Sequence, residues 1–239
     1  MKNDEKGKLM VKDWTVGFDA DDTLWHNERF FRLTQQHFAD LLRDHCDPDT
    51  LHRRLLEAER RNLGAYGFGI KGFVLSMIET AIEVSDAQVP ASVIARLLRA
   101  GQDMLAHPIE LLPHAREAVA ALAPVAELVL ITKGDLLDQE RKLAQSGLGE
   151  MFDAVEIVSD KTRDTYSRIF ARHDTAHQMM VGNSLRSDVI PAIEAGAWGV
   201  HVPHDLTWDY EQADAPVTHR HFRRLDSLAE LPGLVTALA

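Results

Sequence analysis

Short apolar runs recur along the chain, and each is followed by a segment with helical periodicity. Five runs rich in Val and Ile are too short for helices and cover 14–18, 128–131, 155–158, 179–181 and 198–202. Runs of this length and composition are typical of strands buried on both faces of a sheet. The helical patterns between them cover 115–122, 136–146, 166–172 and 189–195. Strands that alternate with helices predict an α/β fold with a parallel sheet.

One long interval, 27–107, interrupts this alternation with helical patterns alone. Its first part carries an apolar stripe formed by Phe30, Phe31, Thr34, Phe38, Leu41 and Leu42. Asp47 followed by Pro48 is typical of a helix start, and further helices are expected over 50–62, 72–84 and 90–105. The glycine-rich segment 64–69 predicts a loop between two of these helices. The interval therefore reads as an all-helical insert placed after the first strand.

These patterns divide the chain into three parts. We predict an α/β core formed by 12–26 and 108–239, a helical cap domain over 27–107, and a polar leader over 1–11. Pro108 ends the last helix of the insert because proline cannot continue the helical hydrogen bonds.

Charge and cysteine content narrow the expected surroundings. The 239 residues carry a formal net charge of −11, so no nucleic-acid partner is expected. Basic residues concentrate over 52–61, but Glu57 and Glu59 interrupt them, which is typical of a solvated helix face. The only cysteine, Cys46, excludes a disulfide within the chain and fits a reducing compartment. Since no stretch approaches the roughly 20 apolar residues that span a bilayer, and 1–12 lacks a signal-peptide pattern, we expect a cytoplasmic monomer or homodimer without a membrane partner.

Three carboxylates follow the first predicted strand within four residues: Asp19, Asp21 and Asp22. They would repel one another unless a cation neutralised them, and ligands bind at this end of parallel strands. Dense oxygen ligands suit a hard cation, of which Mg²⁺ is the abundant one. An acidic turn that caps a helix is the alternative. A calcium loop fits less well, because Thr23 and Leu24 occupy positions where that motif has an acidic or amide ligand and a glycine.

Polar groups also follow the next three predicted strands. Thr132 and Lys133 follow the second, Lys161 follows the third, and Asn183 and Asp188 follow the fourth. Singly these are weak signals, because a threonine before a turn is commonly a cap and a lysine is commonly a surface residue. Together they indicate an active site, since each lies at the end of a predicted strand.

In this order the strand ends resemble the motifs of the haloacid dehalogenase superfamily. The first motif there is Asp-x-Asp-x-Thr, matched by Asp19, Asp21 and Thr23. The second is a serine or threonine that closes a hydrophobic strand, matched by Thr132, and the third is a lysine, matched by Lys161.

The fourth motif is the place where the chain departs from the family pattern. The family has Gly-Asp with a second Asp shortly after, whereas this chain has Gly182, Asn183 and Asp188. The resemblance covers 14–202 and implies a Rossmannoid parallel sheet. The helical insert is similar to the superfamily's first (C1) type of cap, which closes over the site.

The resemblance also implies a mechanism. Asp19 attacks phosphorus and becomes an aspartyl-phosphate, and Asp21 gives a proton to the leaving oxygen and later takes one from water. Thr132 binds a phosphoryl oxygen, and Lys161 neutralises charge and orients Asp19. The implied Mg²⁺ site consists of Asp19, the carbonyl of Asp21, Asn183 and Asp188. The implied phosphate-binding residues are Asp19, Ala20, Asp21, Thr132, Lys133 and Lys161.

Asp21 favours phosphomonoester hydrolysis within this superfamily. The 2-haloacid dehalogenases and phosphonatases lack an aspartate two positions after the nucleophile, and a leaving alkoxide needs a proton that a halide does not. A phosphomutase stays open because it uses the same carboxylate pair. A non-catalytic binding module also stays open, because Asn183 replaces the usual acidic residue.

The expected substrate is a small phosphorylated metabolite whose identity the sequence leaves open. Candidates to face the site from the cap side are Trp25, His26, Tyr66, Phe68 and Lys71. Packing of the aromatic members inside the cap is the alternative. His201, His204 and Trp208 could form a second rim, but we favour a surface loop for them.

Overall fold

The core of the protein is a six-stranded parallel sheet with the strand order β3-β2-β1-β4-β5-β6. The computed structural model describes residues 12–239, so the leader expected over 1–11 lies outside the described residues. The strands are β1 (Trp14–Phe18), β2 (Ala126–Lys133), β3 (Ala154–Val158), β4 (His177–Gly182), β5 (Trp198–His201) and β6 (Phe222–Arg224). All neighbouring strands are parallel, which confirms the predicted α/β class.

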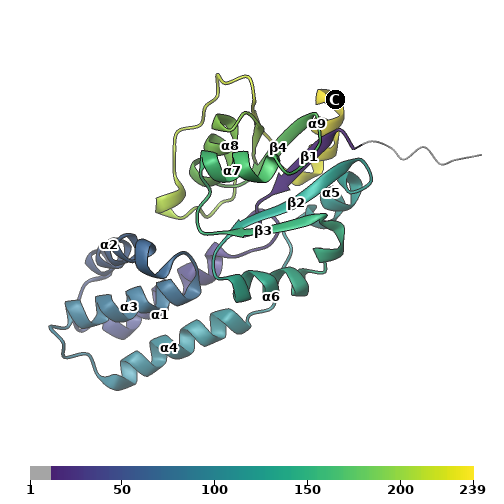
Figure 1. Ribbon diagram of the computed structural model, residues 1–239. Helices are drawn as coiled ribbons and strands as arrows, with labels where there is room; N and C mark the ends of the chain where they lie inside the picture. The colour runs from purple at the N-terminus through teal and green to yellow at the C-terminus, as the bar shows by residue number, and fades with distance from the viewer. Residues whose placement is uncertain (1–11) are drawn as a thin grey trace, which may run out of the picture.

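Helices cover both faces of the sheet (Figure 1). They are α5 (Ala115–Leu122), α6 (Leu136–Ser146), α7 (Arg163–Phe170), α8 (Ile190–Glu194) and α9 (Leu231–Leu238). Alternate residues of a strand point to opposite faces, and the core follows that rule. Leu128 and Leu130 pack in a cluster with α5 and α9, whereas Val129 and Ile131 pack in a second cluster with α7 and α8. Both faces of β2 are therefore buried, as its apolar run predicts.

The insert between β1 and α5 is a separate helical layer, seen at the lower left of Figure 1. It contains α1 (Glu28–Leu42), α2 (Pro48–Tyr66), α3 (Ile70–Val84) and α4 (Ala91–Ala106). These helices bury an apolar cluster of their own around Phe38, Leu55 and Met77. The Asp47 side chain accepts a hydrogen bond from the Thr50 amide at 2.9 Å, which caps α2 at the predicted place. The predicted helical insert is confirmed, while its exact domain boundaries stay a prediction.

One local prediction was wrong, and one short strand was missed. Helix α2 continues through Tyr66, so the loop expected over 64–69 is reduced to the three residues that follow it. Gly67 and Gly69 have φ angles of 70° and 119°, which side chains strongly disfavour, so glycine is needed there. Strand β6 was not predicted, because Phe222–Arg224 is three residues long and contains two arginines.

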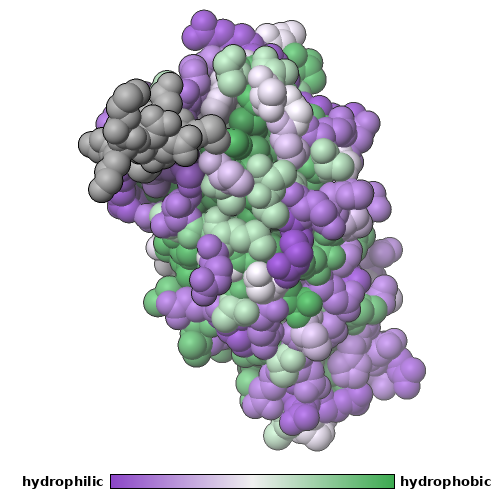
Figure 2. Space-filling view, turned by 90° about the vertical axis from the view of Figure 1, so that its right-hand side faces the viewer, coloured by the Kyte–Doolittle hydropathy of each residue, from purple (hydrophilic) through white to green (hydrophobic). Residues whose placement is uncertain are grey.

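Within residues 12–239, no helix is both long enough and apolar enough to cross a membrane. Figure 2 shows hydrophilic residues around the rim and lower end of one face of the molecule, with hydrophobic residues over much of its middle. The buried apolar clusters described above lie inside the core and inside the insert.

Candidate active site

The polar strand ends meet at one edge of the sheet because the strands are parallel and in register. Phe18 of β1 pairs with Leu130 of β2 and with Val181 of β4. The residues that follow these positions therefore emerge side by side, between the sheet and the helical insert. They line one cavity, with an empty volume of about 1150 Å³ that includes space open to solvent. The sequence-predicted lining residues are Asp19, Asp21, Thr132, Lys133, Lys161, Asn183 and Asp188. Ala20 is buried and does not line the cavity.

Lys161 joins the two most deeply placed carboxylates of the site. Its Nζ donates to Asp19 Oδ1 at 2.5 Å and to Asp188 Oδ1 at 2.7 Å, and all three side chains are buried. Burial raises the pKa of Asp19 to about 7, and repulsion from Asp188 adds to this while Lys161 opposes it. Burial opposes charge on Lys161 as well, but the two carboxylates outweigh it and raise the pKa of the ammonium. The lysine therefore remains charged and fixes Asp19 in place.

Thr23 holds the other oxygen of Asp19. Its hydroxyl donates to Asp19 Oδ2 at 2.9 Å, and it accepts the amide of Asn183 at 3.0 Å. The threonine of the first motif therefore links β1 to the loop after β4 and orients the candidate nucleophile.

Gly182 is needed because Asp188 packs directly on it. A Cβ atom at Gly182 would lie 2.2 Å from Asp188 Oδ2, closer than atoms can approach. The amide of Ser184 donates to that same oxygen at 2.9 Å. A π-helical turn, η2 (Leu185–Val189), brings Asp188 back toward the strand end. The glycine of the fourth motif thus permits this carboxylate to reach Lys161.

The oxygen atoms around Asp19 are of the type that binds a hard cation. Asp19, Asp188 and Asn183 offer only oxygen ligands on this side of the cavity, as Mg²⁺ requires. Within residues 12–239 no three His, Cys, Asp or Glu side chains form a preformed metal cluster. A cation here would therefore depend on the Asn183 amide and a backbone carbonyl as well. The Asn183 Oδ1 atom lies 3.3 Å from the Thr23 hydroxyl.

Asp21 is surrounded by donors that the sequence did not reveal. Its carboxylate accepts from Trp25 Nε1 at 2.7 Å, from Gln139 Nε2 at 2.9 Å and from Lys142 Nζ at 3.0 Å to each oxygen. Lys142 also donates to Asn27 Oδ1 at 2.9 Å, at the start of the insert. Gln139 and Lys142 are buried polar residues on α6, three positions apart and on one face. The sequence signal that could have revealed them is a pair of polar residues at positions where the core-facing side of a helix is usually apolar.

The third carboxylate of the first motif is a helix cap. Asp22 accepts the backbone amides of Asn27 and Glu28 at 2.8 and 2.9 Å, which places its charge at the start of α1. Its φ is 62°, a left-handed conformation that aspartate tolerates better than most residues. Burial raises its pKa to about 6, against these amide bonds. The acidic-turn alternative therefore describes Asp22.

Lys133 lines the cavity but is already engaged. Its Nζ donates to Ser187 Oγ and to Glu211 Oε1, both at 2.7 Å, and lies 4.0 Å from the centre of the Phe68 ring. Burial opposes ionisation of Glu211, but Lys133 and the neighbouring hydroxyls outweigh it and hold the pKa of Glu211 below its usual value. Glu211 lies in the short turn η3 (Asp209–Glu211) after β5, and no motif indicated it.

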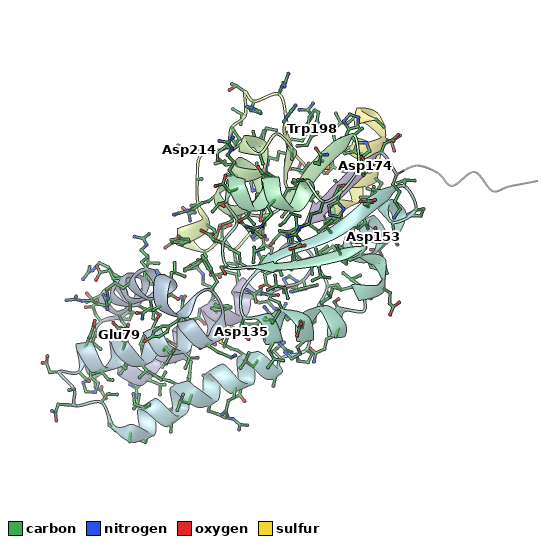
Figure 3. All side chains as sticks on the ribbon, in the orientation of Figure 1. Glu79, Asp135, Asp153, Asp174, Trp198 and Asp214 are labelled. Atoms are coloured by element: carbon green, nitrogen blue, oxygen red, sulfur yellow. The ribbon has the colours of Figure 1, made fainter. Side chains whose placement is uncertain are left out.

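Of the five substrate candidates, only Phe68 lines the cavity. Trp25 is fully buried in the core, where its indole binds Asp21, and His26 lies beside a separate small cavity. Tyr66 is 51% exposed because α2 carries it outside the cavity. Lys71 pairs with Asp135 at 2.8 Å, and Figure 3 shows Asp135 at the junction of insert and core. The placement expected for these four residues was wrong.

The sequence missed most of the insert side of the cavity. Glu28, Phe31, Gln35, Glu59, Asn62, Leu63, Phe73 and Ser76 line it from the insert, and Leu206, Thr207 and Trp208 line it from the loop after β5. The surface-loop interpretation was therefore wrong for Trp208. It was also wrong to treat Glu59 as part of a solvated face, since its side chain is buried.

Comparison with known proteins identifies the family of the chain. Residues 15–196 match the family model described as haloacid dehalogenase-like hydrolase. A haloacid dehalogenase-like family hydrolase from Xanthomonas campestris is 41% identical, with a TM-score of 0.85 over 95% of this chain and 92% of its own. A search of curated proteins finds no match.

More distant structures share the fold. The HAD-hydrolase YfnB from Bacillus subtilis, bound to magnesium, is 16% identical, with a TM-score of 0.66 over 94% of this chain and 99% of its own. L-2-haloacid dehalogenase from Xanthobacter autotrophicus is 19% identical, with a TM-score of 0.62 over 96% of this chain and 100% of its own. The chain belongs to the haloacid dehalogenase-like hydrolases.

Proposed function

We propose that the protein is a Mg²⁺-dependent phosphomonoester hydrolase that acts on a small phosphorylated metabolite. The observation that carries the proposal is the pair of carboxylates at the core end of the cavity. Asp19 is fixed by Lys161 and Thr23, while Asp21 lines the same cavity and is held by different donors. One carboxylate is thus arranged for attack and the other for proton transfer.

Asp21 separates this activity from dehalogenation. A phosphoester leaves as an alkoxide that needs a proton, whereas a halide leaves without one. Every hydrogen bond to Asp21 uses it as an acceptor, which suits the state that takes a proton from the attacking water. To carry a proton in the first step, Asp21 must release one donor. Lys142 can be that donor, because Asn27 and Asp138 offer it other acceptors.

In the first step Asp19 Oδ attacks phosphorus, and the bond from phosphorus to the ester oxygen breaks while Asp21 protonates the leaving alkoxide. In the second step water, deprotonated by Asp21, attacks phosphorus and releases Asp19 with inorganic phosphate. Thr132, at the end of β2, lines the cavity where it can bind a phosphoryl oxygen. Lys161 holds Asp19 through both steps.

Asp19, Asp188, Asn183 and the Asp21 carbonyl are the groups that would hold Mg²⁺. When bound, the metal supplies positive charge that offsets repulsion between the phosphate and these carboxylates. The distant magnesium-bound relative from Bacillus subtilis is consistent with this cofactor.

Release of phosphate from p-nitrophenyl phosphate, with and without Mg²⁺, tests the function. We expect Mg²⁺-dependent release by the native protein and none by Asp19→Asn, a nearly isosteric change. A parallel assay measures chloride released from 2-chloropropionate. Chloride release without phosphate release would make the protein a dehalogenase, and absence of both would support the binding-module alternative.

A further inference from the structure

The charges that line the cavity are divided between its two ends. Its lysines come from the core, and each lies within 3.0 Å of a carboxylate oxygen: Lys133, Lys142 and Lys161. Among the described residues of the insert, those with charge that line the cavity are Glu28 and Glu59. The cations of the cavity are thus already satisfied, whereas its far end is acidic.

Among the described carboxylates that line the cavity, Glu59 has the fewest protein partners. It lies on α2 and is 9% exposed, and it lines the cavity. Within residues 12–239 it forms no ion pair, and the Trp208 side chain is the polar group that lies against it. A carboxylate offers about four acceptor positions, and residues 12–239 leave most of these open to water or to a ligand in the cavity. Burial raises the pKa of Glu59 to about 7, and the nearby Glu28 adds to this.

Glu28 has one cation, and that cation lies outside the cavity. Arg32 Nε donates to Glu28 Oε1 at 3.0 Å, and the arginine also donates to the Thr207 carbonyl at 3.3 Å. Burial raises the pKa of Glu28 to about 7, with repulsion from Asp22 adding and Arg32 opposing. This arginine is 38% exposed and pairs with Glu28 alone, so it does not offset the charge of Glu59.

Aromatic rings line the same cavity: Phe31, Phe68, Phe73 and Trp208. Phe68 and Trp208 meet edge to face, with ring centres 6.3 Å apart. Aromatic faces attract cations, and rings combined with carboxylates are a recurrent way to bind ammonium groups. Lys133 already lies over the Phe68 ring, so the rings of Phe31, Phe73 and Trp208 are those that suit a positively charged group with apolar substituents.

We propose that the insert end of the cavity binds an ammonium group through Glu59 and Glu28, so that the substrates are phosphomonoesters of amino alcohols. A neutral polyol could donate hydrogen bonds to the same carboxylates, but it would leave the buried charge of Glu59 without a cation. An anionic leaving group would be repelled. This inference rests on the proposed phosphomonoester hydrolysis, because it takes the phosphate to lie at the core end.

The test compares ω-aminoalkyl phosphates of two to six carbons with alkyl and hydroxyalkyl phosphates of the same length. Near pH 8 the carboxylates are ionised and alkylammonium groups stay protonated. For the best length we expect kcat/KM to favour the ammonium ester by about 10- to 100-fold, the range of one charge-assisted hydrogen bond. Glu59→Gln should remove most of this preference.

The preference is measured as a ratio within each variant, so a general loss of activity cancels. Glu57→Gln is the matched control, because Glu57 lies two positions away on α2 with 48% of its side chain exposed. It should keep the native ratio. Equal kcat/KM for ammonium and neutral esters, or an ammonium preference that survives in Glu59→Gln, would overturn the inference.

Calorimetry separates this inference from the proposed hydrolysis. The same esters are titrated into the native protein and Glu59→Gln without Mg²⁺. Tighter binding of the ammonium ester by the native protein alone supports the subsite even where no ester is hydrolysed. Equal binding of both esters overturns the subsite, while Mg²⁺-dependent hydrolysis of p-nitrophenyl phosphate would leave the proposed function standing.

Discussion

At the core end of the cavity each buried carboxylate has a cation or several donors, whereas at the insert end Glu59 has no cation among residues 12–239. Asp19 and Asp188 share Lys161, and Asp21 is bound by Lys142. The core end is therefore arranged before a substrate arrives, which is what positioning and electrostatic catalysis require. At the insert end the Glu59 carboxylate has no counter-ion among the described residues, so a cationic ligand can pair with it. On the proposed function, the core end carries out the chemistry and the insert end selects the leaving group.

Removing the proton-transfer group at the core end should cause the largest loss of activity. Asp21→Asn keeps the size of the side chain but cannot exchange a proton, so we expect kcat to fall about 10²–10⁴-fold. The loss should be greater for alkyl phosphates than for p-nitrophenyl phosphate, whose leaving group needs less protonation. Steady-state rates for both esters measure this. Equal losses for the two would argue against Asp21 as the acid.

Lys142→Met should lower activity because Asp21 loses a contact that holds it in position. The change keeps an apolar stem but removes the ammonium that contacts both oxygens of Asp21. We expect kcat to fall about 10–10²-fold, with KM little changed and the larger loss for poor leaving groups. Lys71→Met serves as the control lysine. A uniform loss across leaving groups, parallel to a fall in Tm, would show a purely structural role.

Much of the core end could be predicted because its residues directly follow strands. A register of parallel strands then brings Asp19, Thr132 and Asn183 together without knowledge of the helices. The insert end could not be predicted, because Glu28 and Glu59 lie on different helices and neither follows a motif. In the sequence Glu59 resembles Glu57, two positions before it. Only packing of α2 against α3 and the Trp208 loop buries one and leaves the other exposed.

The support around Asp21 was missed for a related reason. The indole of Trp25 faces the core rather than the substrate, and Gln139 and Lys142 lie on a helix whose contacts depend on the finished sheet. A helical pattern predicts which residues share a face, but not which carboxylate that face will meet.

The unmet charge of Glu59 should also appear in stability. Its pKa is about 7 when folded and near 4.5 when unfolded, so the folded protein binds more protons between these values. The free energy of unfolding should therefore fall as pH rises through this window. Glu59→Gln removes the cost, and we expect it to be about 1–3 kcal/mol more stable than the native protein near pH 8.

Near pH 4.5 the two forms should differ little, because Glu59 is then largely protonated in the folded state. Urea unfolding at both pH values measures the difference. A variant that is less stable near pH 8 would mean that Glu59 has a stabilising partner in the protein itself.

Asn183→Asp tests whether the side chain at position 183 binds Mg²⁺. A carboxylate in place of the amide adds a hard anionic oxygen, so we expect the Mg²⁺ concentration for half-maximal activity to fall several-fold. Turnover need not rise, since the added charge also repels the phosphate. Titration of Mg²⁺ against activity decides the matter. A half-saturation point that stays or rises would place Asn183 outside the metal's ligands.

The smallest effect on activity and stability is expected for the ion pair that joins the insert to the core. Lys71 is 58% exposed and pairs with Asp135 outside the cavity. Lys71→Met should change the free energy of unfolding by about 0–1 kcal/mol and leave KM unchanged for every ester. A selective rise in KM for one class of ester would show that Lys71 reaches the substrate.

Chemical trapping of the intermediate tests the central claim about the core end. Borohydride reduces an aspartyl-phosphate to homoserine, which mass spectrometry of peptides can locate. During turnover of a phosphomonoester with Mg²⁺, we predict homoserine at position 19 in the native protein and none in Asp19→Asn. Turnover without conversion at Asp19, or conversion at Asp21 instead, would contradict the assignment of Asp19 as the nucleophile.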